Sequence, residues 1–181
     1  AERPTGIAPG SDGAAQRLTA ALQAGKLASL DPDQTDEGLR ALLWRRWSGQ
    51  LVRRSFSVPF AKGPMTYETM TWTSPPTTQT RRAVDQLLSS VCQSAAPADL
   101  AQWLTRLRVM TASQAMAAED TKLAVTAYAE SCCEYPADVV RATLDQWRRD
   151  SRWWPAWADL QSIFDCRCHQ RRLLRQSLLE A

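Results

Sequence analysis

The sequence predicts an all-α protein: a small antiparallel helical bundle with a helical N-terminal extension and a long irregular connection. Two observations lead to this fold class. Apolar residues recur at helical spacing over most of the chain, above all after Pro76. Pro97, Pro136 and Pro155 each precede such a stretch, where a helix can begin without losing a needed N–H donor. The 181 residues are enough to bury one core without disulfides or metal.

The N-terminal part is expected to hold a lead-in and two helices. Residues 1–12 are rich in Pro, Gly and small polar residues, and we expect a flexible lead-in there. Residues 13–54 are predicted to be helical. A weakly amphipathic helix is expected from Gly13 to Leu30, and a stronger one with an acidic first turn begins at Thr35 or Asp36.

Residues 55–77 are predicted to form the long connection. Prolines interrupt this stretch, and Thr, Tyr and Trp nearly alternate within it, so a short extended pair is an open alternative. Its large side chains predict that it lies over the domain rather than apart from it: Phe56, Phe60, Met65, Tyr67, Met70 and Trp72.

Residues 78–181 are predicted to form a C-terminal helical domain of five helices. The first carries Val84, Leu87, Leu88 and Val91, and the second follows Pro97. The third is expected from about Ala115 to Cys133, and the last two open at Pro136 and Pro155. Short connections between these helices favour antiparallel neighbours.

Four tryptophans and three arginines fall within WRRDSRWWPAWADL, residues 147–160. Trp147 and Trp157 continue the apolar stripes of two successive helices, so most of the cluster is expected in the core. Trp153 lies off both stripes and is expected to be partly exposed. The candidate contact residues in this segment are Arg148, Arg149, Arg152 and Trp153.

The last helix carries a second candidate site. Arg167, Arg171 and Arg175 recur at four-residue spacing with Arg172 beside them, which predicts one basic helical face. Such a face can contact phosphates, although a solvated surface is the more common explanation. The net charge of only +3, from 22 basic and 19 acidic residues, does not by itself imply affinity for nucleic acid.

The residues needed for most catalytic chemistry are missing. The chain has one histidine, His169, seven glycines and no phosphate-binding glycine motif, so we expect no enzyme and no cofactor. One alternative is a zinc site built from Cys132, Cys133, Cys166, Cys168 and His169. The spacing is poor for a tetrahedral site, and we expect the protein to fold without metal.

The predicted location is cytoplasmic. Five cysteines form an odd set with an adjacent pair, no leader-like segment precedes them, and no apolar run is long enough for a membrane helix. We therefore expect reduced thiols and no membrane association.

Part of the C-terminal half resembles a known group of proteins. The matching text is WLTRLRVMTA, TAYAESCCEYPADVVRATLDQW, RWWPAWADLQSI and RRLLRQSLL, within residues 101–179. It resembles small helical phage and prophage replication proteins of the helicase-loader group. The resemblance implies a non-enzymatic replication accessory protein that binds a replicative helicase, as loader or inhibitor, with the basic tail touching single-stranded DNA. The alternatives are a DNA-binding regulator that uses arginine-bearing helices, and an adaptor or inhibitor of another host protein.

Overall fold

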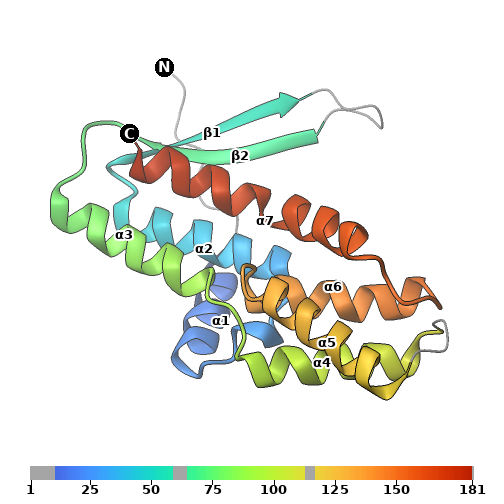
Figure 1. Ribbon diagram of the computed structural model, residues 1–181. Helices are drawn as coiled ribbons and strands as arrows, with labels where there is room; N and C mark the ends of the chain where they lie inside the picture. Colours follow the sequence, from blue (N-terminus) through green and yellow to red (C-terminus); the bar gives the residue numbers. More distant parts are fainter. Residues whose placement is uncertain (1–10, 59–64, 113–116, 181) are drawn as a thin grey trace. The chain divides into compact units, whose positions relative to one another are not determined.

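The computed structural model describes residues 11–58, 65–112 and 117–180, so residues 1–10 of the predicted lead-in lie outside it. The described chain is mostly helical with one two-stranded antiparallel sheet, which confirms the all-α prediction in its broad form (Figure 1). Its α-helices are α1 (Ser11–Gln23), α2 (Pro32–Trp47), α3 (Thr78–Val91), α4 (Pro97–Met110), α5 (Ala118–Cys132), α6 (Ala137–Asp150) and α7 (Trp157–Leu179). A short 3-10 helix, η1 (Leu27–Ser29), follows α1, and the strands are β1 (Leu51–Val58) and β2 (Met65–Trp72).

The N-terminal helix predicted from Gly13 to Leu30 is two pieces rather than one. Gly25 has a φ of 63°, in the left-handed region that favours glycine, and it separates α1 from η1. Among the proline-led helices, α4 begins at Pro97 as predicted, whereas Pro136 is the residue just before α6. Pro155 lies two residues before the start of α7.

The described residues divide into two compact units that do not follow the order of the chain. Unit 1 comprises α1, α2 from Asp33 onward, both strands, α3 and the part of α7 from His169 onward. Unit 2 comprises η1, α4, α5, α6 and α7 up to Cys168. The boundary at residue 78 that we expected from the sequence therefore falls inside unit 1.

Unit 1 is packed around a close approach of α1 and α2. A Cβ at Gly38 would lie 2.7 Å from the Ala14 carbonyl oxygen and 2.9 Å from Leu18 Cβ, so only glycine fits this crossing without a shift. The largest fully buried aliphatic side chains of the unit are Leu18, Leu39, Leu43, Val84, Leu88, Val91 and Leu178. Within unit 1, the last turns of α7 thus share a core with α1, α2 and α3.

The segment between α2 and α3 is a β-hairpin that begins at Leu51, so the prediction of a helix to residue 54 is wrong. The extended pair that the sequence left open within residues 55–77 is present, in place of a wholly irregular connection. Leu51 pairs with Trp72 and Val58 with Met65 in an antiparallel register. Successive side chains of a strand point to opposite faces of the sheet, and accordingly Leu51 is buried whereas Val52 is exposed. β-branched and aromatic residues in the second strand favour this extended pairing over a helix.

The hairpin is attached to the last turns of α7. Trp72 Nε1 donates to the Leu178 carbonyl at 2.9 Å, and the hydroxyls of Thr69 and Ser177 lie 2.7 Å apart. The predicted packing of this segment on the domain is supported by Met70, which is buried. Phe60 and the side chains of Phe56, Met65 and Tyr67 lie outside the described residues.

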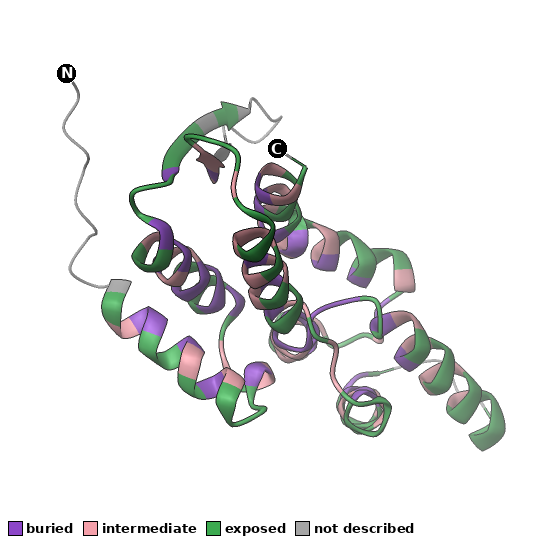
Figure 2. Cartoon of the chain, turned by 90° about the vertical axis from the view of Figure 1, so that its left-hand side faces the viewer, coloured by how far each residue is buried: buried purple, intermediate pink, exposed green. Residues whose placement is uncertain are grey.

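Unit 2 has a core built where α4, α5, α6 and the first half of α7 meet. Buried residues occupy the sides of the helices that pack on one another, and exposed residues the outer sides (Figure 2). The buried cluster consists of Leu100, Leu104, Leu107, Ala129, Cys132, Tyr135, Val139, Val140, Leu144, Leu160, Phe164 and Cys168. η1 packs against α6 in the same unit, and Leu27 is its buried residue.

Candidate partner-binding site

The α6–α7 corner, which contains residues 147–157, is closed by hydrogen bonds among its own residues. The Ser151 N–H donates to the Trp147 carbonyl at 2.8 Å where α6 ends. The Trp147 indole N–H then donates to the Trp153 carbonyl at 2.8 Å, and the Trp153 N–H donates to Ser151 Oγ at 3.1 Å. These hydrogen bonds hold the backbone of the loop in a single conformation.

Neighbouring segments hold the same corner from outside. The Ala112 N–H donates to the Arg152 carbonyl at 2.6 Å, and the Trp154 N–H donates to the Ala112 carbonyl at 2.9 Å. From α5, the Tyr128 hydroxyl donates to the Pro155 carbonyl at 3.1 Å. Because each residue from Ser151 to Pro155 has at least one backbone group with a protein partner, the corner is a rigid connection rather than a free loop.

Three of the corner tryptophans belong to the packing of unit 2. Trp147, Trp154 and Trp157 are partly buried against the core. The Trp157 ring lies 5.5 Å from Tyr128 and 6.1 Å from Phe164, measured between ring centroids. Trp154 packs on Tyr128 at 5.3 Å. The prediction that most of this cluster serves the core is confirmed.

Trp153 is different, because 55% of its surface is exposed. The prediction that it is the exposed member of the cluster is therefore confirmed. The Arg152 guanidinium lies 5.0 Å from the centre of the Trp153 ring, at the distance of a cation–π contact. Met110, at the end of α4, is also exposed, and its sulfur lies 3.5 Å from Arg148 Nη1. We call Met110, Arg148, Arg149, Arg152 and Trp153 the corner surface.

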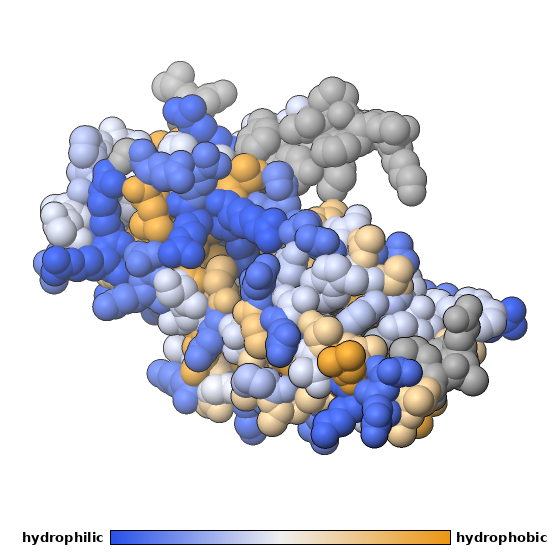
Figure 3. All heavy atoms as spheres, in the orientation of Figure 1, coloured by the Kyte–Doolittle hydropathy of each residue, from blue (hydrophilic) through white to orange (hydrophobic). Residues whose placement is uncertain are grey.

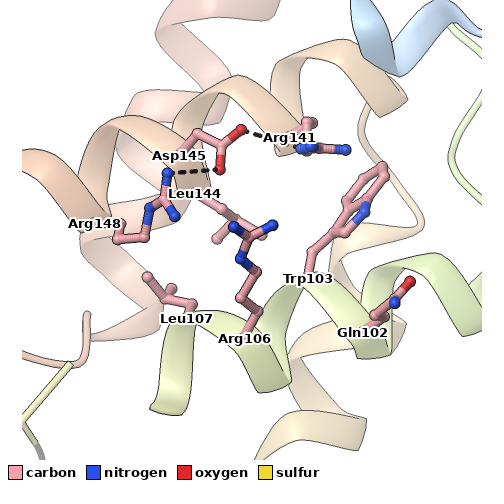
Figure 4. Close-up of a pocket in the computed structure, with 8 residues that line it drawn as sticks. All are labelled: Gln102, Trp103, Arg106, Leu107, Arg141, Leu144, Asp145 and Arg148. Carbon is pink, nitrogen blue, oxygen red and sulfur yellow. Dashed lines mark hydrogen bonds and ion pairs between the residues drawn. The ribbon is translucent and has the colours of Figure 1, made fainter. Parts of the chain in front are cut away.

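A pocket of about 210 Å³ lies between α4 and α6, next to the corner surface (Figure 4). We call it the α4–α6 pocket. Its lining residues are Gln102, Trp103, Arg106, Leu107, Arg141, Leu144, Asp145 and Arg148. Leu107 and Leu144 are buried members of the core cluster, so the bottom of the pocket is apolar.

The polar groups of this pocket form a connected set. The Asp145 carboxylate accepts from Arg141 Nε at 3.1 Å and lies 3.8 Å from Arg148 Nη2. The Arg141 guanidinium lies 5.2 Å from the centre of the Trp103 ring. Figure 4 shows Arg106 reaching from α4 into the space between these groups. Three arginines against one aspartate leave the pocket with an excess of two positive charges.

The predicted basic face of α7 is only partly available for binding. Arg171 is 2% exposed, its Nε donates to Asp36 Oδ1 at 2.5 Å, and its Nη1 donates to the Val91 carbonyl at 3.0 Å. The prediction that Arg171 contacts a partner from the surface is therefore wrong, because packing within unit 1 buries it. Arg175 Nη2 pairs with Asp85 Oδ1 at 2.9 Å on the surface of that unit.

The other two arginines of the stripe differ from each other. Arg172 is exposed in unit 1. Arg167 lies in unit 2, where it donates to the side chain of Gln146 on α6. The four arginines that looked like one face in the sequence therefore have four different surroundings.

The structure adds site residues that the sequence reasoning missed: Trp103, Arg106, Arg141 and Asp145. A signal for them was present. Arg141, Asp145 and Arg148 recur at spacings of four and three, which places them on one face of a helix. Trp103 and Arg106 are three residues apart and lie on one face of α4. What the sequence does not contain is the packing of α4 on α6 that brings the two faces together.

The cysteines do not converge in the described structure. Cys132 is buried, and burial, together with the neighbouring Cys133, raises the pKa of its thiol to about 12. A metal ligand must be a thiolate, so this shift disfavours Cys132 as a ligand. Within residues 11–58, 65–112 and 117–180, no group of three or more His, Cys, Asp or Glu side chains could hold a metal ion.

The surface outside these features is mixed in character. On the face drawn in Figure 3, hydrophobic residues form separate small groups among hydrophilic ones. Among the described residues of unit 2, the large exposed hydrophobic ones are Val109, Met110, Leu123 and Trp153. In the part of the chain that the structure describes, no helix combines the length and the apolar character that crossing a bilayer requires.

Comparison with known proteins adds no relative. The chain has no significant match among protein-family models, curated proteins or solved structures.

Proposed function

We propose that this chain is a non-enzymatic replication accessory protein of the phage or prophage type. Its corner surface binds a replicative helicase and either helps to load it or inhibits it. The observation that carries the proposal is Trp153, an exposed aromatic ring on a backbone held by hydrogen bonds from α6 and from Ala112.

An exposed tryptophan beside arginines fits a protein contact for a physical reason. Tryptophan and arginine are enriched among the residues that contribute most to protein–protein affinity. A contact loop that is already ordered loses little conformational entropy when a partner binds. Since Trp147, Ser151 and Ala112 already fix the backbone around Trp153, the ring is presented to a partner at low entropic cost.

The resemblance in residues 101–179 supports the choice of partner, and it includes the corner surface. Arg172, exposed near the end of the chain, is a candidate contact to single-stranded DNA. It is a secondary element of the proposal, because Arg171 is buried and Arg175 is paired with Asp85.

A DNA-binding regulator is the second candidate function. Exposed Arg149 and Arg152 on one corner favour it. Against it, Asp145 is paired with Arg141 and Arg148, and the net charge of the whole chain is only +3. A duplex-binding protein usually neutralises several phosphates with arginine and lysine side chains that have no acidic partner. An adaptor or inhibitor of another host protein would use the same corner surface on a different partner.

The three functions differ in what the purified protein binds. We expect it to co-elute with a bacterial replicative helicase in size-exclusion chromatography, and to bind duplex DNA weakly in fluorescence anisotropy, with little sequence preference. Tight duplex binding that falls steeply with added salt, together with no helicase complex, would establish the regulator instead. Binding to neither would leave the adaptor function.

A further inference from the structure

We propose that the α4–α6 pocket receives an acidic side chain, Asp or Glu, from an apolar segment of the protein partner. This inference rests on the proposed function only in taking the partner to be a protein. It names the chemistry of the partner segment, and the same segment is expected whether the partner is a helicase or another protein.

Charge is the first argument for an acidic side chain. The pocket brings Arg106, Arg141 and Arg148 together with a single carboxylate, that of Asp145. Asp145 is already engaged with Arg141 and Arg148. Among the described residues, no carboxylate forms an ion pair with Arg106. Its guanidinium therefore remains available for the two-pronged contact that arginine makes with a carboxylate.

Arg148 also has a hydrogen-bond donor beside the pocket that lacks a partner in the described part of the chain. Its Nε atom is buried and has no hydrogen-bond partner among the described residues. A buried N–H donor without a partner is costly, and native proteins rarely leave one. An oxygen placed in the pocket by a partner would lie among the donors of Arg106 and Arg148, both of which line it.

The walls of the pocket favour a protein side chain over a nucleic-acid phosphate. Leu107 and Leu144 form its bottom, and the Trp103 ring forms a side (Figure 4). An aliphatic stem with a carboxylate at its end matches this combination of apolar and cationic surfaces. A phosphodiester has no aliphatic stem beside its charge that could cover the apolar bottom.

The position of the pocket connects it to the corner surface. Arg148 Nη2 faces Asp145 in the pocket, while Arg148 Nη1 lies beside the sulfur of the exposed residue Met110. A partner segment that places its acid in the pocket would therefore have an apolar contact within reach on Met110. The expected ligand is an acidic residue flanked by aliphatic or aromatic residues.

A selection from a library of random peptides displayed on phage particles tests this inference without the helicase. The full-length wild-type protein is the target, and the affinities of the selected peptides are measured by fluorescence anisotropy. The test variant is Arg106→Glu, because Arg106 is exposed. The matched control is Arg82→Glu, the same charge change at an exposed position on α3 in unit 1.

We expect the selected peptides to contain Asp or Glu beside apolar residues. Their affinity should fall about tenfold or more for Arg106→Glu, and change less than about twofold for Arg82→Glu. Replacing the peptide acid by its amide should cause a similar loss in binding to the wild-type protein. Thermal melting of both variants should match the wild type.

Three results would overturn the inference: selected peptides without acids, equal binding to wild type and Arg106→Glu, or oligo(dT) bound more tightly than any peptide and lost in Arg106→Glu. The last result would assign the pocket to nucleic acid. Failure of the helicase to bind would end the proposed function but not the inference if the peptides behave as expected. A helicase that binds the wild type, together with any of these three results, would end the inference but not the proposed function.

Discussion

At the scale of single residues, Trp153 and Trp157 show how position decides the role of a tryptophan. Trp157 lies between Tyr128 and Phe164, whereas more than half of Trp153 is exposed. We expect Trp157→Ala to lower the free energy of unfolding by about 3 kcal/mol, because it removes a ring packed on the core. Trp153→Ala should change it by less than about 0.5 kcal/mol.

Urea denaturation followed by circular dichroism measures both values. An equal loss of stability in the two variants would show that Trp153 is also a packing residue. The corner would then be purely structural, and the proposed contact would lie elsewhere.

Cys132 provides a second test at this scale. Burial raises the pKa of its thiol from 9.0 to about 12, so the folded protein keeps it protonated at neutral pH. At about pH 8, iodoacetamide should modify the exposed Cys133 and Cys166 while sparing Cys132 until the protein unfolds. Mass spectrometry of the labelled peptides would show the order, and early labelling of Cys132 would contradict the buried position.

The same shift sets the direction of a pH effect. In the unfolded chain the Cys132 thiol loses its proton near pH 9, whereas the folded protein holds it to about pH 12. Rising pH therefore favours the unfolded form, and the stability contributed by the protonated thiol is present below pH 9 and declines between these values.

At the scale of elements, the end of α7 contains two arginines that differ in burial: Arg171 is buried in unit 1, whereas Arg175 lies on its surface. Arg171 is buried and joins α7 to Asp36 of α2 and to the last carbonyl of α3. Arg171→Ala should lower the free energy of unfolding by about 3–5 kcal/mol, because the buried Asp36 would lose its counter-charge. Arg175→Ala is the control, since its pair with Asp85 is about half exposed and should contribute about 0–1 kcal/mol.

Thermal or urea unfolding of the two variants distinguishes these roles. If Arg171→Ala were as stable as Arg175→Ala, Arg171 would not join the helices of unit 1 as the structure indicates. The four-residue spacing in the sequence shows which residues share a helical face, but not which part of that face is covered by other helices. That is why Arg171 was predicted to be a surface residue.

The β-hairpin shows another limit of sequence reasoning at this scale. Arginines and leucines in residues 39–54 continue the helical pattern of α2 by spacing alone, so the change at Leu51 to an extended strand is not visible there. The long-range partners of the hairpin, Ser177 and Leu178, lie more than a hundred residues away in sequence. The helices with strong apolar stripes, such as α4 and α6, were predictable because their buried faces follow the helical period.

At the scale of the whole molecule, chain order and spatial units do not coincide. α7 contributes to both units, and η1 belongs with the helices of unit 2 although α1 lies in unit 1. Changes of composition along the sequence cannot reveal which segments share a unit, because the contacts that define each unit join segments that are distant in the chain. The arginines and Trp153 of the corner surface were predicted from composition, whereas Met110 and the α4–α6 pocket required the packing of two helices.

The central claim is that the corner surface of unit 2 binds a replicative helicase. The most direct measurement is isothermal titration calorimetry of a bacterial replicative helicase with the wild type and two double variants. Arg149→Glu with Arg152→Glu changes the corner surface. Arg45→Glu with Arg82→Glu makes the same charge change at exposed positions of unit 1.

The claim predicts that the unit 1 variant binds like the wild type, that the corner variant binds about tenfold or more weakly, and that all three proteins melt alike. Equal affinity of all three for the helicase, or no helicase binding by the wild-type protein, would contradict it.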